Sequence, residues 1–141
     1  MKVIIIDGQG GKMGKLLIER IKSAEMGCEI TAVGTNSIAT SVMLKAGADS
    51  GATGENAVVV ACRDADIIIG PIGIVVADSL LGEVSPTMAV AVGQSKAKKL
   101  LLPVNLCNNI VVGTLSLPLS RLVAEAIEEL SRALKTQNTI S

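Results

Sequence analysis

The run Val3-Ile4-Ile5-Ile6-Asp7 leads directly into Gly8-Gln9-Gly10-Gly11-Lys12-Met13-Gly14, and this stretch decides the fold. Consecutive β-branched residues are typical of a parallel strand that helices cover on both faces. From Lys12 to about Met26 the apolar residues recur at helical spacing. Glycines between a strand and a helix allow a sharp turn and let a phosphate approach the N–H groups at the helix start. The stretch therefore predicts a nucleotide-binding βα unit.

The rest of the chain continues this alternation of strands and helices. Residues 55–63 are ambiguous, and we predict a helix there because Asp66–Ile69 is the stronger strand candidate. Ser85 and Pro86 suit the N-cap and the first turn of a further helix. The other expected strands are 29–33, an irregular one within 46–53, 100–104 and a short sixth at 110–112. The other expected helices are 37–46, 74–81 and 119–134. In the helix 37–46 we expect Ile38, Val42 and Ala46 on the inner face.

These elements predict an α/β fold. Residues 1–134 should form a single Rossmann-like domain, with a doubly wound, mostly parallel sheet and helices on both faces. The expected order of the strands in the sheet is 3-2-1-4-5-6. Residues 135–141 should form a frayed C-terminal tail.

The composition excludes several classes of function. The chain has 13 basic and 13 acidic residues, so no net charge attracts nucleic acid or an anionic membrane, and we expect neither as a partner. It has no His, Phe, Tyr or Trp, which removes imidazole chemistry and aromatic stacking, and we expect no metal. The scattered Cys28, Cys62 and Cys107 indicate buried thiols in a reducing compartment, so we expect a cytoplasmic protein. The high aliphatic content favours a homo-oligomer, with a dimer the commonest form.

The glycine loop can be aligned with two patterns. It fails G-x-G-x-x-G, because Met13 stands where the third glycine should be, whereas Gly8, Gly11 and Gly14 complete G-x-x-G-x-x-G. With Met before the last glycine, it resembles the Gly-x-x-Gly-Arg-Met-Gly turn of dihydrodipicolinate reductases, and that resemblance implies NAD(P)H binding. It covers only residues 1–17. Those reductases also use a His-His and Lys motif in a second domain, and this chain has no His, so the resemblance does not extend to their activity.

Two features depart from an NAD-binding fingerprint. The fingerprint needs an acid at the end of the second strand, about 20 residues after the loop, to hold the ribose hydroxyls. Thr35, Asn36 and Ser37 stand there instead, so they would bind the sugar through uncharged hydrogen bonds. The second departure is Asp7, whose carboxylate beside the loop would repel a diphosphate. We interpret Asp7 as an organiser that accepts loop N–H groups, with a metal-binding or catalytic role as the alternative.

A set of specific motifs extends over nearly the whole chain, comprising the glycine loop, Gly34–Thr40, Ala46–Asp49, Gly51–Ala57, Gly70–Gly73 and Gly93–Ala97. Together they resemble a bacterial family of small proteins that is catalogued only as a domain of unknown function. The resemblance implies a Rossmann-like fold and names no substrate.

The carboxyl ends of parallel strands meet at one edge of the sheet, where open α/β sheets bind ligands. The residues predicted to bind a cofactor follow the first, second and fourth strands: Gly8, Gln9, Gly10, Gly11, Lys12, Met13, Gly14, Thr35, Asn36, Ser37, Gly70, Pro71, Ile72 and Gly73. Asn105 should lie at the same edge. Asp7 and Glu55 are the candidates for catalysis. The structural alternative is that small polar residues at these positions only cap helices.

Three hypotheses for function follow. The first is a module that binds a nucleotide or a phosphate ligand, with NAD(P) the leading candidate, acting as a sensor or a subunit. The second is a small NAD(P)-dependent reductase whose active site is completed across a homodimer. The third is a structural scaffold with a vestigial site.

Overall fold

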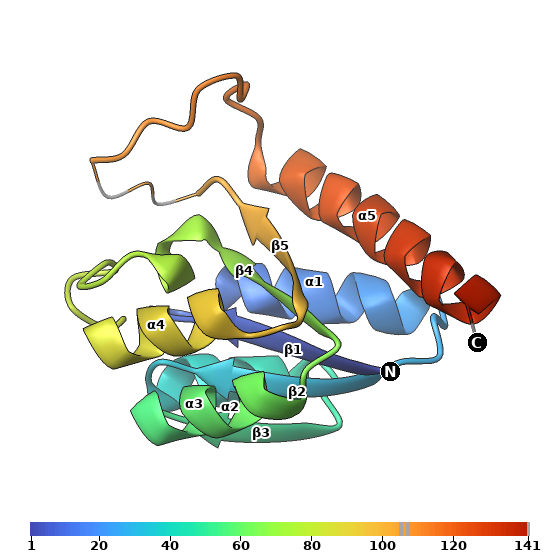
Figure 1. Cartoon of the computed structure of the whole chain (residues 1–141), viewed down its shortest axis with the longest axis horizontal. Coiled ribbons are helices and arrows are strands. Elements are labelled where there is room, and N and C mark those ends of the chain that lie inside the picture. The colour runs from blue at the N-terminus through green and yellow to red at the C-terminus, as the bar shows by residue number, and fades with distance from the viewer. Residues whose placement is uncertain (105, 107, 141) are drawn as a thin grey trace.

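Strands and helices alternate along the whole chain (Figure 1). The structure is a computed structural model that describes residues 1–104, 106 and 108–140. Its strands are β1 (Lys2–Asp7), β2 (Glu29–Gly34), β3 (Ser50–Thr53), β4 (Ile67–Pro71) and β5 (Lys98–Leu102). Its α-helices are α1 (Lys12–Ser23), α2 (Ser37–Lys45), α3 (Glu55–Asp64), α4 (Pro86–Gln94) and α5 (Leu119–Ile140), and Ile72–Val75 forms the short 3-10 helix η1. The helix predicted at 55–63 and the irregular third strand are confirmed.

The strands form one parallel sheet in the order β3-β2-β1-β4-β5. β1 lies at its centre, where Ile5 pairs with Ala32 of β2 on one side and with Ile69 of β4 on the other. The chain therefore moves outward from β1 to β3 and then crosses to β4, which is the doubly wound topology predicted from the sequence. The crossing places a topological switch point between β1 and β4, beside the glycine loop.

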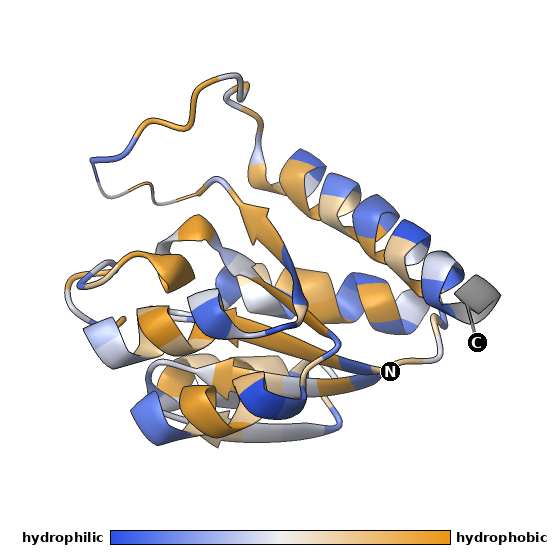
Figure 2. Ribbon diagram, viewed as in Figure 1, coloured by the Kyte–Doolittle hydropathy of each residue, from blue (hydrophilic) through white to orange (hydrophobic). Residues whose placement is uncertain are grey.

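Each face of the sheet is buried under its own set of helices. Val3 and Ile5 point into a core that contains residues of α1, α2 and α5, whereas Ile4 and Ile6 point into a core formed with α3 and α4. Side chains on a strand alternate between its faces, so a continuous apolar run is needed to fill both cores. Figure 2 shows the apolar residues along the central strands and the alternation of polar and apolar residues around α1 and α5.

The predicted sixth strand is wrong. Residues 110–112 lie in the connection between β5 and α5, and the side chains of Ile110 and Val112 are 88% and 91% exposed. Left-handed backbone at Asn108 and Gly113 turns the chain on both sides of this short run, which leaves too few extended residues to pair with β5. β5 is consequently an edge strand of the described sheet.

The helix predicted at 74–81 is also wrong. After η1 the chain forms a series of turns, with left-handed backbone at Asp78, Leu80, Leu81 and Gly82. The hydroxyl of Ser79 donates a hydrogen bond to the carbonyl oxygen of Gly73, so a side chain takes an acceptor that a continuing helix would need. We call residues 76–85 the β4–α4 connection. It ends at Ser85, which caps α4 as predicted by accepting a hydrogen bond from the N–H of Met88.

Two details of the helices also differ from the sequence prediction. The inner face of α2 is formed by Ala39 and Met43, while Ile38 is 67% exposed. The backbone of Ala39 lies against Gly11 of the glycine loop, where an added Cβ would be 2.9 Å from the Cα of Ala39. The residues expected to fray from 135 onward instead continue α5 as far as Ile140. Among the described residues, no helix has the length and apolar character that crossing a membrane requires.

Gly11 should be essential to the fold, whereas its neighbour Gly10 should not be. Gly11 has φ of 76°, and a Cβ there would lie 2.9 Å from the Cα of Ala39. Gly10 would meet nothing within 4 Å. We expect Gly11→Ala to lower the free energy of unfolding by at least about 1–2 kcal/mol, the cost of left-handed backbone alone, and Gly10→Ala to leave it unchanged within about 0.5 kcal/mol. Urea unfolding followed by far-ultraviolet circular dichroism measures both, and equal stability of the two variants would contradict this packing.

Candidate functional site

The glycine loop and the end of β2 lie side by side at the carboxyl edge of the sheet. Asp7, the last residue of β1, pairs with Gly34, the last residue of β2. The pairing continues one step beyond the strands, because the N–H of Thr35 donates to the carbonyl oxygen of Asp7 at 3.0 Å. The side-chain amide of Asn36 then donates to the carbonyl oxygen of Gln9 at 2.9 Å. The structure therefore brings together two of the predicted groups of site residues.

Asp7 holds the turn from β1 into α1. Its Oδ1 accepts a hydrogen bond from the N–H of Gly8 at 2.8 Å, and its Oδ2 accepts one from the N–H of Gly14 at 2.7 Å. The side chain is buried. These are the contacts expected of a loop organiser, and a catalytic role for Asp7 stays a prediction.

The environment of Asp7 opposes its negative charge. Burial raises the pKa of the Asp7 carboxyl, and the N–H groups of Gly14 and Gly8 oppose that rise without cancelling it. The nearby carboxylate of Glu83 raises this pKa further. Burial is thus the largest influence on the pKa of Asp7.

Glu83, from the β4–α4 connection, lies over the loop and joins it to the end of β2. Its Oε1 accepts hydrogen bonds from the N–H of Gln9 at 2.9 Å, the hydroxyl of Thr35 at 2.8 Å and the amide of Asn36 at 2.7 Å. Partial burial acts to raise the pKa of Glu83, but the three donors outweigh it, so the pKa is lowered. Glu83 is therefore a carboxylate held in its charged form.

Leu80 packs on the loop beside Glu83. A Cβ added to Gly8 would lie 2.5 Å from Oγ1 of Thr35, 2.9 Å from Cδ1 of Leu80 and 3.1 Å from Oε1 of Glu83. The first glycine of the loop is therefore needed because Thr35, after β2, and the β4–α4 connection both pack directly on it. Packing within the protein is therefore sufficient to explain why position 8 is a glycine.

The loop exposes only part of itself to solvent. Gln9, Gly10 and Lys12 are exposed, whereas Gly8, Gly11, Met13 and Gly14 are buried. Gly11 precedes α1 as its N-cap residue, so Lys12 is the first residue of that helix. A ligand that approaches from solvent therefore meets the backbone of Gly10 and the side chain of Lys12 at the helix start.

The predicted site residues at the end of β4, Gly70 to Gly73, are less accessible to solvent. Gly70, Pro71 and Gly73 are buried and Ile72 is half-buried. A Cβ on Gly70 would lie 2.6 Å from the carbonyl oxygen of Ile6, so the close approach of β1 explains this glycine. Pro71 ends β4, and Gly73 accepts the hydrogen bond from Ser79. These residues support the β4–α4 connection, and direct cofactor contacts from them remain a prediction.

The other candidates lie around the same edge. Asn36 is the N-cap of α2 and accepts a hydrogen bond from the N–H of Ala39, while Ser37 is exposed at the first position of that helix. Glu55 begins α3, where its Oε2 accepts a hydrogen bond from the hydroxyl of Ser85 at 2.6 Å. A catalytic role for Glu55 remains a prediction. Asn105 and Cys107 lie outside the described residues.

The described cysteines have the properties of unreactive thiols. Burial raises the pKa of Cys62 to about 11, against a lowering effect of Lys99. Burial also raises the pKa of Cys28. Because the thiolate is the reactive form, neither is suited to act as a nucleophile at neutral pH.

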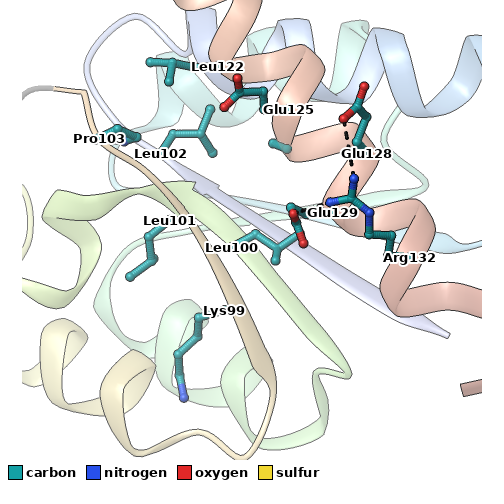
Figure 3. Close-up of a pocket in the computed structure, with 11 residues that line it drawn as sticks. Lys99, Leu100, Leu101, Leu102, Pro103, Leu122, Glu125, Glu128, Glu129 and Arg132 are labelled. Carbon is teal, nitrogen blue, oxygen red and sulfur yellow. Dashed lines mark hydrogen bonds and ion pairs between the residues drawn. The ribbon is translucent and has the colours of Figure 1, made fainter. Parts of the chain in front are cut away.

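Two open clefts of similar size lie away from the glycine loop. One, of about 520 Å³, lies between β5 and α5, with Leu100, Leu102 and Leu122 along it and with Arg132 paired to Glu128 and Glu129 on its rim (Figure 3). The other, of about 540 Å³, lies between α3 and α4 beside Cys62. Neither contains a residue predicted to bind a cofactor. Within the described part of the chain, no group of three or more Cys, Asp or Glu side chains is arranged to hold a metal ion.

Glu83 is the member of the site that sequence reasoning missed. It follows Gly82 in a segment with the apolar content of a helix, and nothing local connects it to Gln9, which lies 74 positions earlier. The absence of an acid after β2 was the one available signal, because it indicated that a carboxylate could come from elsewhere.

Removing the Asp7 carboxylate should destabilise the protein. Asp7→Ala leaves the buried N–H groups of Gly8 and Gly14 without their acceptor, and we expect the free energy of unfolding to fall by roughly 1–3 kcal/mol. Asp64→Ala, at an exposed position at the end of α3, is the matched control and should change it by less than about 0.5 kcal/mol. Urea unfolding by circular dichroism compares them. Equal stabilities would show that Asp7 does not organise the loop.

Comparisons with known proteins support the family resemblance seen in the sequence. No curated protein is similar enough to this chain to count as a relative. The fold is similar to the crystal structure of a dodecameric FMN-dependent UbiX-like decarboxylase from Escherichia coli O157:H7, with a TM-score of 0.47 and 19% identity over 94% of this chain and 76% of that chain. A match this distant carries no information about the ligand or the assembly of this chain. Residues 2–135 match the family model described as a domain of unknown function, DUF3842, and the chain belongs to that family.

Proposed function

We propose that this protein is a binding module for a nucleotide, with NAD(P) as the leading candidate ligand. The observation that carries the proposal is the position of the exposed Gly10 and Lys12 at the start of α1, beside the polar groups of Thr35 and Asn36. A phosphate-binding helix start and a hydrogen-bonding surface for a sugar thus lie next to each other. They do so at the switch point of a doubly wound sheet, where such folds bind ligands.

The phosphate would bind at the exposed part of the glycine loop. The N-terminus of a helix attracts anions through the positive end of its dipole. In the first turn of α1 the N–H of Gly14 is already bound to Asp7, so the dipole and Lys12 are the groups that remain for a phosphate. Lys12 adds a full positive charge there, and Gly10 has no side chain to block the approach. Asp7 lies behind the loop with both carboxylate oxygens hydrogen-bonded to it. The N–H groups of Gly8 and Gly14 face this carboxylate and offset part of its negative charge.

The chemistry of the site favours a binding module over a reductase. The sequence has no His, and burial raises the pKa of Cys28 and Cys62. Glu55 is hydrogen-bonded to the N-cap residue of α4. A sensor or a subunit of a larger assembly needs none of these groups for chemistry, and this is the function that we propose.

A homodimer is part of the proposal. The connection from β5 to α5 exposes Ile110, Val112 and Leu115 by 88%, 91% and 77%. Its residues from 108 onward extend away from the sheet before the chain enters α5 (Figure 1). Exposed apolar residues favour association because it removes them from water. β5, the edge strand of the described sheet, favours it as well, because an edge strand offers its backbone groups to another chain. We therefore propose a second copy of this chain as the partner, because it carries the same exposed apolar residues and the same edge strand.

A panel of nucleotides tests the binding proposal. NAD, NADP, ATP, AMP, FAD and coenzyme A are each added during differential scanning calorimetry, since the chain has no Trp or Tyr to serve as a fluorescent probe. A ligand at about 1,000 times its Kd should add about 4 kcal/mol of stability and raise Tm by several degrees. Gly10→Ala should weaken the binding roughly tenfold or more, a loss of about 1.4 kcal/mol, because the new methyl group lies where the phosphate approaches.

Gly93→Ala is the matched control, because a Cβ at Gly93 also meets nothing within 4 Å but lies in α4. It should bind the ligand as the unaltered protein does. If no nucleotide raises Tm, or if both variants bind equally well, the proposed site is wrong.

Light scattering at micromolar concentration tests the dimer. We expect a mass of about twice the chain's 14.4 kDa and, for the double variant Ile110→Asp and Val112→Asp, the mass of a monomer. The charged side chains oppose burial of this surface, since an unpaired buried charge costs several kcal/mol. Val90→Asp, at a position 53% exposed on α4, should remain dimeric. A monomeric unaltered protein would exclude the dimer.

A further inference from the structure

We propose that Glu83 determines which nucleotide binds, by accepting hydrogen bonds from a free ribose diol and excluding a sugar that carries a 2′-phosphate. This inference rests on the proposed nucleotide site and specifies its sugar end. In NAD-binding proteins with a doubly wound sheet, an acid at the end of the second strand holds the ribose hydroxyls. Here Thr35 and Asn36 occupy that place, and they hold a carboxylate that arrives from the β4–α4 connection.

The carboxylate of Glu83 is fixed before any ligand arrives. The three donors from Gln9, Thr35 and Asn36 all bind its Oε1. Among the residues that the structure describes, none donates a hydrogen bond to its Oε2, and the side chain is only partly buried. An acceptor held in place in this way binds a hydroxyl pair without losing further rotamer freedom. Oε2 therefore suits the two donors of a ribose diol.

The hydrogen bonds also place Glu83 next to the turn that we propose binds the phosphate. Gln9, whose N–H donates to Glu83, is followed directly by the exposed Gly10. In a nucleoside 5′-phosphate the sugar hydroxyls and the phosphate are separated by only a few bonds. One ligand would therefore meet the backbone of Gly10 with its phosphate and Glu83 with its sugar.

The negative charge of Glu83 also makes the site selective against a nucleotide that carries a 2′-phosphate. A phosphate on the 2′-oxygen would meet the Glu83 carboxylate, and like charges in contact oppose binding. No Lys or Arg within the described residues forms an ion pair with Glu83; the ion pairs that the structure contains join Lys22 to Asp49 and residues along α5. The site should accordingly favour NAD and AMP over nucleotides with a 2′-phosphate.

The main rival is that Glu83 occupies the place of an anionic group of the ligand and has to leave when it binds. The two roles predict opposite effects of removing the carboxylate. If Glu83 binds the sugar, affinity falls. If Glu83 blocks the site, affinity rises.

Isothermal titration calorimetry with three probes tests the inference: AMP, 2′-deoxy-AMP and adenosine 2′,5′-bisphosphate. For the unaltered protein we expect AMP to bind about ten- to a hundredfold more tightly than either of the others, the range for hydrogen bonds to a charged group. Glu83→Gln should weaken AMP binding by a similar factor, leave 2′-deoxy-AMP nearly unchanged and relieve the penalty against the bisphosphate. Glu19→Gln, an exposed position on α1, should keep the affinities of the unaltered protein.

Each other outcome has one meaning. Unchanged discrimination in a folded Glu83→Gln variant, checked by circular dichroism, would overturn the inference. Tighter binding of all three probes to Glu83→Ala would overturn it as well and would assign Glu83 the blocking role. If the unaltered protein binds 2′-deoxy-AMP and AMP equally, the nucleotide site stands and the role of Glu83 fails. If it binds none of the nucleotides, the proposed function fails and the inference fails with it.

Discussion

Two backbone N–H groups, those of Gly8 and Gly14, converge on the carboxylate of Asp7, and these hydrogen bonds fix how β1 turns into α1. The turn sets the place of everything around it. Gly11 can then lie against Ala39 of α2, and the exposed Gly10 and Lys12 are left at the start of α1. A buried carboxylate costs free energy unless it is hydrogen-bonded, so Asp7 has to keep both partners. The loop is therefore built around a structural acid, and the rim that this acid leaves open is where we propose that a ligand binds.

The sheet explains why polar groups meet above that rim. Parallel strands end at a common edge, and the switch point between β1 and β4 leaves room there for the β4–α4 connection to cross the loop. Ser79 bonded to Gly73 and the left-handed residues from Asp78 onward bring Glu83 onto Gln9, Thr35 and Asn36. One carboxylate thus connects three segments that are remote in sequence. An arrangement of this kind orders a site before its ligand binds.

Sequence reasoning succeeded where the signal was local. The run Val3–Ile6, the cap formed by Ser85 and the glycine loop each depend on near neighbours, so the fold class, the order of the first five strands and the family could be predicted. It failed where long-range packing decided the outcome. Ile110–Val112 has strand propensity but turns on both sides, and Ile38 yields the inner face of α2 to Ala39 because the glycine loop lies close. Glu83 was missed because its partners at Gln9, Thr35 and Asn36 lie far away in the sequence.

The central claim is that a nucleotide binds where the glycine loop, the end of β2 and the β4–α4 connection meet. The measurement that tests it most directly is a titration of isotope-labelled protein with NAD, followed through the backbone amide resonances in nuclear magnetic resonance. The account predicts that the shifts concentrate at Gln9, Gly10, Lys12, Asn36 and Glu83. Shifts concentrated at the cleft between β5 and α5, around Leu100 and Leu122, would contradict it, and so would a titration that moves no resonance.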